Sequence, residues 1–251
     1  MRVILKTLLK NYLKIITKMV LFVHRPTVIA IAGSTNKNFV KQEIKKILRE
    51  FNFSTRVNPK NFNTEIGLPL AILYLPSGYN EYQKWLPVIF KAPLKLFQKK
   101  FPKFLVLSLG ISDEGDMKYL LSIVKPDISI ITDITQRYKE GFSDMNRLVN
   151  EYELLAQKTK KGGLIILNSD NYRVKEIGKN KEQRVLYYGF KEESDARIEK
   201  TEKNEKGQKI ILRHQGEKRE EQIYRFGKHH SYVLAIGHII KKELKNNAEI
   251  R

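Results

Sequence analysis

The chain has 251 residues with 41% hydrophobic content, which is enough for one main domain around a single buried core. Its 47 Lys and Arg residues outnumber the 27 Asp and Glu residues, and the formal charge of +20 favours anionic partners such as nucleotides or acidic lipid surfaces. Cysteine is absent, which excludes disulfides and thiolate zinc sites and is compatible with a cytoplasmic protein.

Residues 1–25 are predicted to form a separate basic amphipathic helix. Lys6, Lys10, Lys14 and Lys18 recur every four positions, and leucines, isoleucines and aromatic residues fill the opposite face. Lysines at this frequency argue against a helix that crosses a membrane. Two interpretations remain: a helix on an anionic membrane surface, peripheral at the inner face, or a helix docked on its own domain or on a partner. The second is favoured, since apolar helix faces usually pack against a core.

Residues 27–41 are typical of a buried strand, a glycine turn and the start of a helix that carries a lysine. This order is found in phosphate-binding loops, in which backbone N–H groups at a helix N-terminus and a lysine hold an anion. The pattern departs from the Walker consensus at Asn36 and Asn38. An ordinary strand-turn-helix without ligand is the alternative. The candidate nucleotide-binding residues are Gly33, Ser34, Thr35, Asn36, Lys37 and Asn38.

The middle of the chain alternates apolar strands with helical stretches. Strands are predicted over residues 53–57, 104–109, 128–132 and 164–167, and helices over residues 79–100, 116–124 and 143–157. Alternation at this spacing is typical of βαβ units in a mainly parallel sheet with helices on both faces. Ligands bind at the C-terminal ends of such strands. We therefore expect the following residues to gather there: Gly33, Ser108, Asp133 and Asn168.

From about residue 184 the pattern changes to short strands and charged turns, which predict a small antiparallel β extension. The charged run 191–208 is expected to form an exposed edge or hairpin, and a last helix is expected over residues 231–244. The fold class predicted for the whole chain is α/β, with a P-loop-type sheet in a domain spanning residues 26–242. Residues 243–251 are expected to be a polar tail.

Six stretches, taken in order, carry a resemblance to a known family. They are Ala32-Gly-Ser-Thr-Asn-Lys, Asn61-Phe-Asn-Thr-Glu-Ile-Gly-Leu-Pro-Leu, Val106-Leu-Ser-Leu-Gly, Lys125-Pro-Asp-Ile-Ser-Ile-Ile-Thr-Asp-Ile, Gly163-Leu-Ile-Ile-Leu-Asn-Ser-Asp-Asn and Phe226-Gly-Lys-His-His. In order and spacing the chain resembles the central ATP-binding domain of the Mur ligase family, most closely the branch that adds D-alanyl-D-alanine to the UDP-muramoyl tripeptide. The resemblance covers about residues 26–242.

The resemblance implies ATP-dependent chemistry: a substrate carboxylate is phosphorylated, and an amino group then attacks the acyl phosphate to form an amide. It also implies a loop lysine and Mg²⁺ ions that neutralise the transferred phosphoryl group. Several family positions for the nucleotide and the metal are replaced in this chain: the loop threonine by Asn38, the metal-binding glutamate by Ser108, the metal-binding histidine by Tyr138, the carbamylated lysine by Glu151, and the adenine-contacting asparagine by Val233. We therefore expect weak or absent Mg²⁺ binding and no protein metal site.

On the substrate side, the resemblance implies roles for Asn61, Asn63, Glu65 and His229. The ordinary alternative for the asparagines is turn formation, because their side chains bond to nearby backbone. The family's N-terminal and C-terminal domains have no counterpart in these 251 residues, so a degenerate stand-alone central domain is expected.

The leading functional prediction is a nucleotide-binding, regulatory or scaffold module linked to cell-wall peptide biosynthesis. It would be a pseudoenzyme that binds ATP or ADP and contacts other cell-wall ligases. Because the basic residues are spread along the chain without a recognisable motif, no nucleic acid is expected as a partner. The first alternative is an active ATP-dependent amide-forming ligase completed by a partner protein. The second is a basic scaffold tethered to an anionic membrane through residues 1–25.

Overall fold

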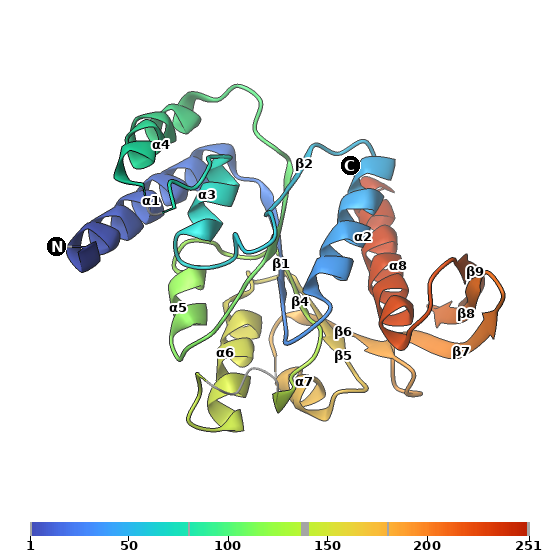
Figure 1. The fold of residues 1–251 in the computed structure, drawn as a ribbon. Helices are drawn as coiled ribbons and strands as arrows, with labels where there is room; N and C mark the ends of the chain where they lie inside the picture. Colours follow the sequence, from blue (N-terminus) through green and yellow to red (C-terminus); the bar gives the residue numbers. More distant parts are fainter. Residues whose placement is uncertain (1, 80, 137–140, 180, 250–251) are drawn as a thin grey trace.

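The computed structural model describes residues 2–79, 81–136, 141–179 and 181–249, and these residues form an α/β fold (Figure 1). The strands are β1 (Thr27–Ala32), β2 (Thr55–Val57), β3 (Phe104–Ser108), β4 (Ile128–Ile131), β5 (Leu164–Asn168), β6 (Arg184–Gly189), β7 (Ala196–Asn204), β8 (Gly207–His214) and β9 (Glu217–Ile223). The helices are α1 (Arg2–His24), α2 (Lys37–Glu50), α3 (Gly67–Leu73), α4 (Tyr82–Leu94), the 3-10 turn η1 (Lys95–Phe97), α5 (Asp116–Leu121), α6 (Met145–Lys158), α7 (Tyr172–Ile177) and α8 (Lys228–Glu249).

The strands join in one sheet with the order β2-β3-β1-β4-β5-β6-β7-β8-β9. Pairing is parallel from β2 through β7 and antiparallel from β7 to β9. The predicted fold class is thereby confirmed, including the antiparallel extension. Strand β1 lies between β3 and β4, so the chain leaves it toward one side of the sheet and later crosses to the other. Crevices at such a reversal are the usual ligand sites of open parallel sheets.

Both faces of the sheet are covered by helices, because alternate strand residues point to opposite faces. Val28 and Ala30 of β1 pack on one side with α3, α5, α6 and α7. Ile29 and Ile31 pack on the other side with α2 and α8. The sheet is therefore buried on both faces around the loop that follows β1.

Local side-chain contacts fix where two of the helices begin. Asp144 precedes α6 and accepts hydrogen bonds from the N–H groups of Asn146 and Arg147 at 2.7 and 3.0 Å. Asn171 precedes α7 and accepts one from the N–H of Val174 at 3.2 Å. Short polar side chains satisfy the N–H groups that have no partner within the first turn of a helix, and so set its start.

Helix α1 packs on the domain through a small third core shared with α3 and α4. Leu13 and Val20 are fully buried there, while the Nζ of Lys6 lies 3.2 Å from Glu65 and the Nζ of Lys10 lies 3.9 Å above the ring of Tyr119. The lysine side of the helix thus also contacts the domain, and much of its apolar side faces solvent. No helix among the described residues is both long enough and apolar enough to cross a membrane.

The C-terminal part has longer elements than the sequence pattern predicts. Strands β7 and β8 form a hairpin across the charged run, and β9 adds a third antiparallel strand. Helix α8 continues to Glu249, so residues 243–249 extend the helix past the predicted domain boundary. Charged side chains on one exposed face hide the period of a strand or helix from sequence analysis, because the inward face alone carries the apolar signal.

Candidate functional site

The loop after β1 has the backbone geometry of a tight strand-to-helix turn. Gly33 adopts φ 138°, and a Cβ there would lie 2.0 Å from the Oγ1 of Thr132. Asn36 adopts the left-handed conformation at φ 63° and precedes the first residue of α2. Asparagine tolerates this conformation better than most residues, so the turn forms without a second glycine.

The loop is fastened to the end of β4 by hydrogen bonds to Asp133. The backbone oxygen of Asp133 accepts from the N–H of Ser34 at 2.8 Å, and its carboxylate accepts from the N–H of Thr35 at 2.8 Å and from the Thr35 hydroxyl. Thr132 donates to the backbone oxygen of Thr35 at 2.8 Å. Two loop N–H groups therefore have acceptors within the protein. The N–H groups at the α2 N-terminus are then the main backbone hydrogen-bond donors for an anion.

Lys37 is the first residue of α2, and its side chain folds back over the loop. Its Nζ donates to the backbone oxygen of Gly33. Burial lowers the pKa of Lys37, and the nearby Asp133 carboxylate opposes that shift. A positive charge thus lies where the helix dipole already favours an anion.

A cavity of about 400 Å³, here called the loop cavity, opens beside this turn. Its wall includes Gly33, Ser34, Thr35, Asn36, Lys37, Asn38, Phe39, Lys60, Asn61, Asn63, Ser108 and Tyr152. All six predicted nucleotide-binding residues lie in this wall, together with two of the four residues predicted for the substrate side. The other two lie elsewhere: Glu65 is paired with Lys6, and the ring of His229 lies 5.0 Å from that of Phe39.

A buried lysine lies behind Ser108, and its hydrogen bonds go to neutral oxygen atoms. Lys41 is 2% exposed, and its Nζ donates to the backbone oxygen of Asn58 at 2.7 Å and lies 3.4 Å from the Oγ of Ser108. The Asn58 side chain bridges the two residues, accepting from the N–H of Ser108 at 2.9 Å. Burial lowers the pKa of Lys41 to about 8. The sequence pattern does not single out Lys41, because lysines on amphipathic helices are usually exposed.

The groups around Ser108 do not fit a Mg²⁺ ion. Mg²⁺ needs carboxylate or similar oxygen ligands in an octahedral shell, whereas the end of β3 offers the neutral Ser108 hydroxyl next to an ammonium group. Within the described ranges no cluster of three His, Asp or Glu side chains is arranged to hold a metal. Tyr138, which is predicted to replace a metal-binding histidine, lies outside the described residues. Glu151, which is predicted to replace a carbamylated lysine, accepts hydrogen bonds from the N–H groups of Gly115 and Met117 at the start of α5.

The low pKa of Lys41 predicts a specific pH dependence of stability. In the unfolded chain the lysine has its ordinary pKa of 10.5, so between pH 8 and 10.5 the folded protein has released a proton that the unfolded chain keeps. The free energy of unfolding should therefore rise with pH in this interval, relative to a Lys41→Met variant, by at most about 3 kcal/mol. Urea unfolding of both proteins near pH 7 and near pH 10 measures the difference. A difference that stays constant with pH would contradict the assignment.

A second cavity, of about 220 Å³, lies between the ends of β4 and β5 and helix α8. We call it the tyrosine cavity, since Tyr188 of β6 and Tyr232 of α8 form part of its wall. The Tyr188 hydroxyl donates to the backbone oxygen of Thr132 at 3.2 Å, and the Nδ2 of Asn168 donates to the same atom at 2.9 Å. Burial raises the pKa of Tyr188, which stays neutral. Flat aromatic rings beside amide groups are typical of sites for planar heterocycles.

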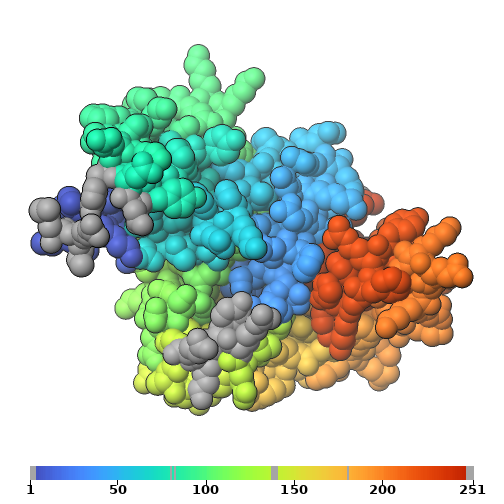
Figure 2. Space-filling view, in the orientation of Figure 1, coloured from blue at the N-terminus to red at the C-terminus, as the bar shows by residue number. Residues whose placement is uncertain are grey.

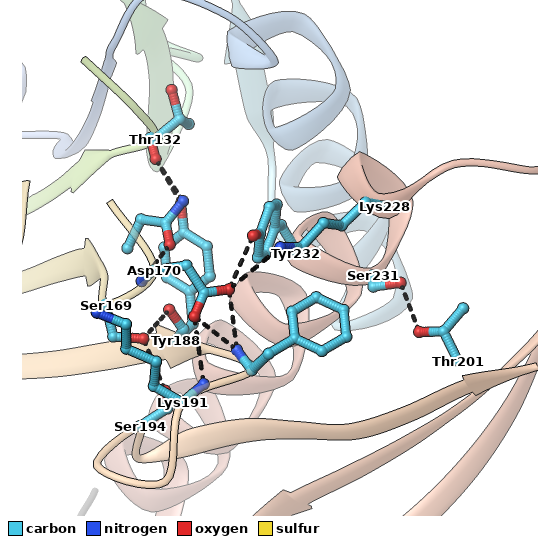
Figure 3. A network of polar contacts seen from close by, with 12 residues as sticks. Thr132, Ser169, Asp170, Tyr188, Lys191, Ser194, Thr201, Lys228, Ser231 and Tyr232 are labelled. Carbon is cyan, nitrogen blue, oxygen red and sulfur yellow. Dashed lines mark hydrogen bonds and ion pairs between the residues drawn. The ribbon is translucent and has the colours of Figure 1, made fainter. Parts of the chain in front are cut away.

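Asp170 organises the wall of the tyrosine cavity (Figure 3). Its carboxylate accepts from the hydroxyl of Tyr232 at 2.8 Å and from the N–H groups of Phe190 and Lys191 at 3.0 and 3.2 Å. The Nζ of Lys228 lies 3.9 Å away. Burial and the Asp170 carboxylate raise the pKa of Tyr232, so its proton stays in this hydrogen bond. The network ties β5, β6 and α8 together.

The two cavities meet at Asn36, which lies in the wall of both. The four strand-end residues predicted to gather at one edge are divided between them: Gly33 and Ser108 belong to the loop cavity, and Asp133 and Asn168 to the tyrosine cavity. One side of Asn36 is therefore basic and suited to phosphate, and the other is aromatic and amide-lined. This pairing matches the two halves of a nucleotide.

Comparison with known proteins places these features in a family. Residues 87–237 match the model of the Mur ligase middle domain. The chain is 27% identical over 169 residues to the UDP-N-acetylmuramoyl-tripeptide–D-alanyl-D-alanine ligase of Buchnera aphidicola, covering 67% of this chain and 32% of that protein. It is 31% identical over 123 residues to the enzyme of that name from Borreliella burgdorferi, covering 49% of this chain and 21% of that protein.

Solved structures share the fold. MurF from Acinetobacter baumannii superposes with a TM-score of 0.76 at 17% identity, covering 94% of this chain and 47% of that one. MurF ligase from Thermotoga maritima in complex with ADP gives a TM-score of 0.76 at 18% identity, covering 94% and 49%. The chain thus spans about a third of the length of the first curated relative and about half of these structures.

Proposed function

The chain belongs to the Mur ligase family through its middle domain, and we propose that it binds ADP or ATP without carrying out Mg²⁺-dependent phosphoryl transfer. The observation that carries this proposal is the Lys41 ammonium next to Ser108, where the metal would need a carboxylate. In this role the protein is a nucleotide-responsive module linked to cell-wall peptide synthesis.

Nucleotide binding is supported by the two adjoining cavities. The phosphates would lie in the loop cavity, at the α2 N-terminus and within reach of Lys37 and Lys60. The base and ribose would lie in the tyrosine cavity against Tyr188 and Tyr232. A solved relative in complex with ADP, similar in fold, supports this class of ligand.

Loss of phosphoryl transfer is supported by charge. Transfer of a phosphoryl group builds up negative charge that metal ions and a lysine must neutralise. Each electrostatic element removed costs about 3 kcal/mol of transition-state stabilisation. Here Ser108 offers no charge to a metal, Asn38 offers an amide instead of a hydroxyl, and the buried Lys41 ammonium repels a divalent cation.

The link to cell-wall synthesis is supported by the relatives, which are named as ligases acting on UDP-N-acetylmuramoyl peptides. A module that keeps the nucleotide cavities could contact such ligases and respond to the ADP and ATP that they use. A complete amide-forming ligase assembled with a partner protein is the competing possibility. It predicts ADP release when a UDP-muramoyl peptide and the partner are added.

Isothermal titration with ADP and with ATP, each with and without Mg²⁺, tests the proposal. We expect binding that is the same with and without Mg²⁺ and no release of phosphate. Lys37→Ala should weaken the binding of both nucleotides about tenfold or more, since it removes a charge-assisted contact to phosphate, and should leave adenosine binding unchanged.

The matched control is Lys46→Ala, which removes an exposed lysine from the same helix, where it is paired with Glu43 at 3.8 Å. This variant should bind nucleotide like the wild type. Binding that requires Mg²⁺, or turnover of ATP, would refute the proposal. Equal affinity of the Lys37→Ala and Lys46→Ala variants would remove Lys37 from the site.

A further inference from the structure

Helices α1 and α4 carry exposed apolar stripes. On α1, Leu8, Ile15 and Phe22 repeat every seven residues and are 61%, 57% and 73% exposed. On α4 and the turn η1, Leu86, Phe90 and Phe97 follow one helix flank and are 56%, 73% and 82% exposed. Large aromatic and aliphatic side chains grouped in this way on a surface mark an interaction site.

The two stripes flank a direct contact between the helices. The hydroxyl of Tyr12 donates to the backbone oxygen of Ile89 at 2.7 Å, and Tyr12 lies one turn from both Leu8 and Ile15. Leu86 and Phe90 lie within one turn of Ile89. Figure 1 shows α1 and α4 next to each other at the side of the molecule away from α8. The six exposed side chains therefore lie on two helices in direct contact, and we call them together the α1–α4 face.

The charge around this face is mainly positive, and two neighbouring carboxylates, Glu65 and Glu81, are paired with Lys6 and Lys84. Residues 2–25 and 82–103 together contain twelve Lys and Arg residues and no Asp or Glu. The exposed ones include Lys18, Lys91, Lys99 and Lys100. Each basic residue close to an anionic lipid surface adds about 1 kcal/mol of attraction.

We propose that the α1–α4 face binds an anionic lipid bilayer, with α1 and α4 lying along the surface. The apolar stripes would enter the boundary between headgroups and acyl chains, while the lysines contact lipid phosphates. A second copy of the chain is a poorer occupant, because a symmetric contact would oppose two basic surfaces. The orange β7–β9 extension lies at the opposite side of the molecule and would face away from the lipid (Figure 2).

Co-sedimentation of the full chain with vesicles tests the proposal. We expect binding to vesicles of phosphatidylcholine mixed with phosphatidylglycerol, much weaker binding to phosphatidylcholine alone, and release by salt. Phe90→Ser should lower partitioning into the mixed vesicles at least tenfold, because the free energy gained by burying a phenyl ring corresponds to at least a tenfold change in the partition coefficient. Phe90 is mostly exposed, so the variant should keep the unfolding midpoint of the wild type.

The matched control is Tyr224→Ser, which removes an aromatic residue that is 75% exposed but lies just after β9. It should partition like the wild type. Equal binding to neutral and anionic vesicles, or no loss with Phe90→Ser, would overturn the proposal. The proposal would also be overturned if the protein did not bind vesicles and sedimentation velocity showed a dimer that Phe90→Ser abolishes. A second copy of the chain would then cover the face.

Discussion

Gly33→Ala is expected to lower the free energy of unfolding by about 4 kcal/mol and to abolish nucleotide binding. A Cβ at this position would lie 2.0 Å from the Oγ1 of Thr132 and 3.0 Å from the backbone nitrogen of Asp133, at a φ of 138° that L-residues rarely adopt. Relief of the clash requires the loop to move away from β4, which would break its hydrogen bonds to Asp133. Urea unfolding and titration with ADP measure the two effects.

The control for this prediction is Gly162→Ala. Gly162 also has a positive φ, of 73°, but a Cβ there would meet no atom within 4 Å. Gly162→Ala should lower the free energy of unfolding by about 1 to 2 kcal/mol, the cost of the backbone conformation alone, and should leave ADP binding unchanged. If the two variants were equally stable, close packing at Gly33 would not be what holds the loop.

Asp170→Ala is expected to cost about 3 kcal/mol or more of stability and to weaken ADP binding. The carboxylate is 13% exposed and accepts hydrogen bonds from the Tyr232 hydroxyl and from two backbone N–H groups. Alanine leaves these donors without a partner in a largely buried site, which costs more than the hydrogen bonds alone. Free of Asp170, Tyr232 would also lose its fixed position in the tyrosine cavity. Urea unfolding and ADP titration again measure both effects.

Asp195→Ala provides the comparison, because Asp195 is exposed and accepts a hydrogen bond from the N–H of Tyr187 at 2.7 Å. It should cost about 1 kcal/mol and leave nucleotide affinity unchanged. A loss for Asp170→Ala no larger than this would mean that the network around Asp170 does not stabilise the junction of β5, β6 and α8.

Local sequence patterns are sufficient to predict the parallel part of the fold. The apolar runs of β1, β3, β4 and β5 are buried on both faces, so they stand out as continuous hydrophobic segments. The turn after β1 is also predictable, since a glycine placed between a buried strand and a helix with a lysine is typical of a tight strand-to-helix loop. These features depend on residues close together in the sequence.

The tyrosine cavity is not predictable in the same way. Asp170, Tyr188 and Tyr232 come from three separate segments and meet only because β5 pairs with β6 and α8 crosses that end of the sheet. The environment of Lys41 is hidden for a related reason. A lysine in a helix interior is usually solvated, and its burial depends on Asn58, which lies 17 residues away.

The orientation of α1 is only partly accessible from the sequence. Its amphipathic period correctly predicts a helix, but the periodicity does not reveal which face contacts the domain. Tyr119 attracts Lys10 through its ring, and Glu65 attracts Lys6 by charge, so part of the basic side lies against the domain, whereas Lys18 is exposed. Tertiary partners of this kind decide the rotation of a helix about its own axis.

Strand β9 ends the sheet with a row of charges of both signs. Lys218, Arg219, Glu220 and Glu221 are all exposed on this outermost strand, and at the other rim β2 has only three residues. Addition of a strand from a neighbouring molecule to β9 would require desolvation of these charges. At the other rim, β2 is too short to form a stable ladder of backbone hydrogen bonds with an added strand. The sheet is thereby protected against edge-to-edge polymerisation, and any assembly of this protein should form through its helices.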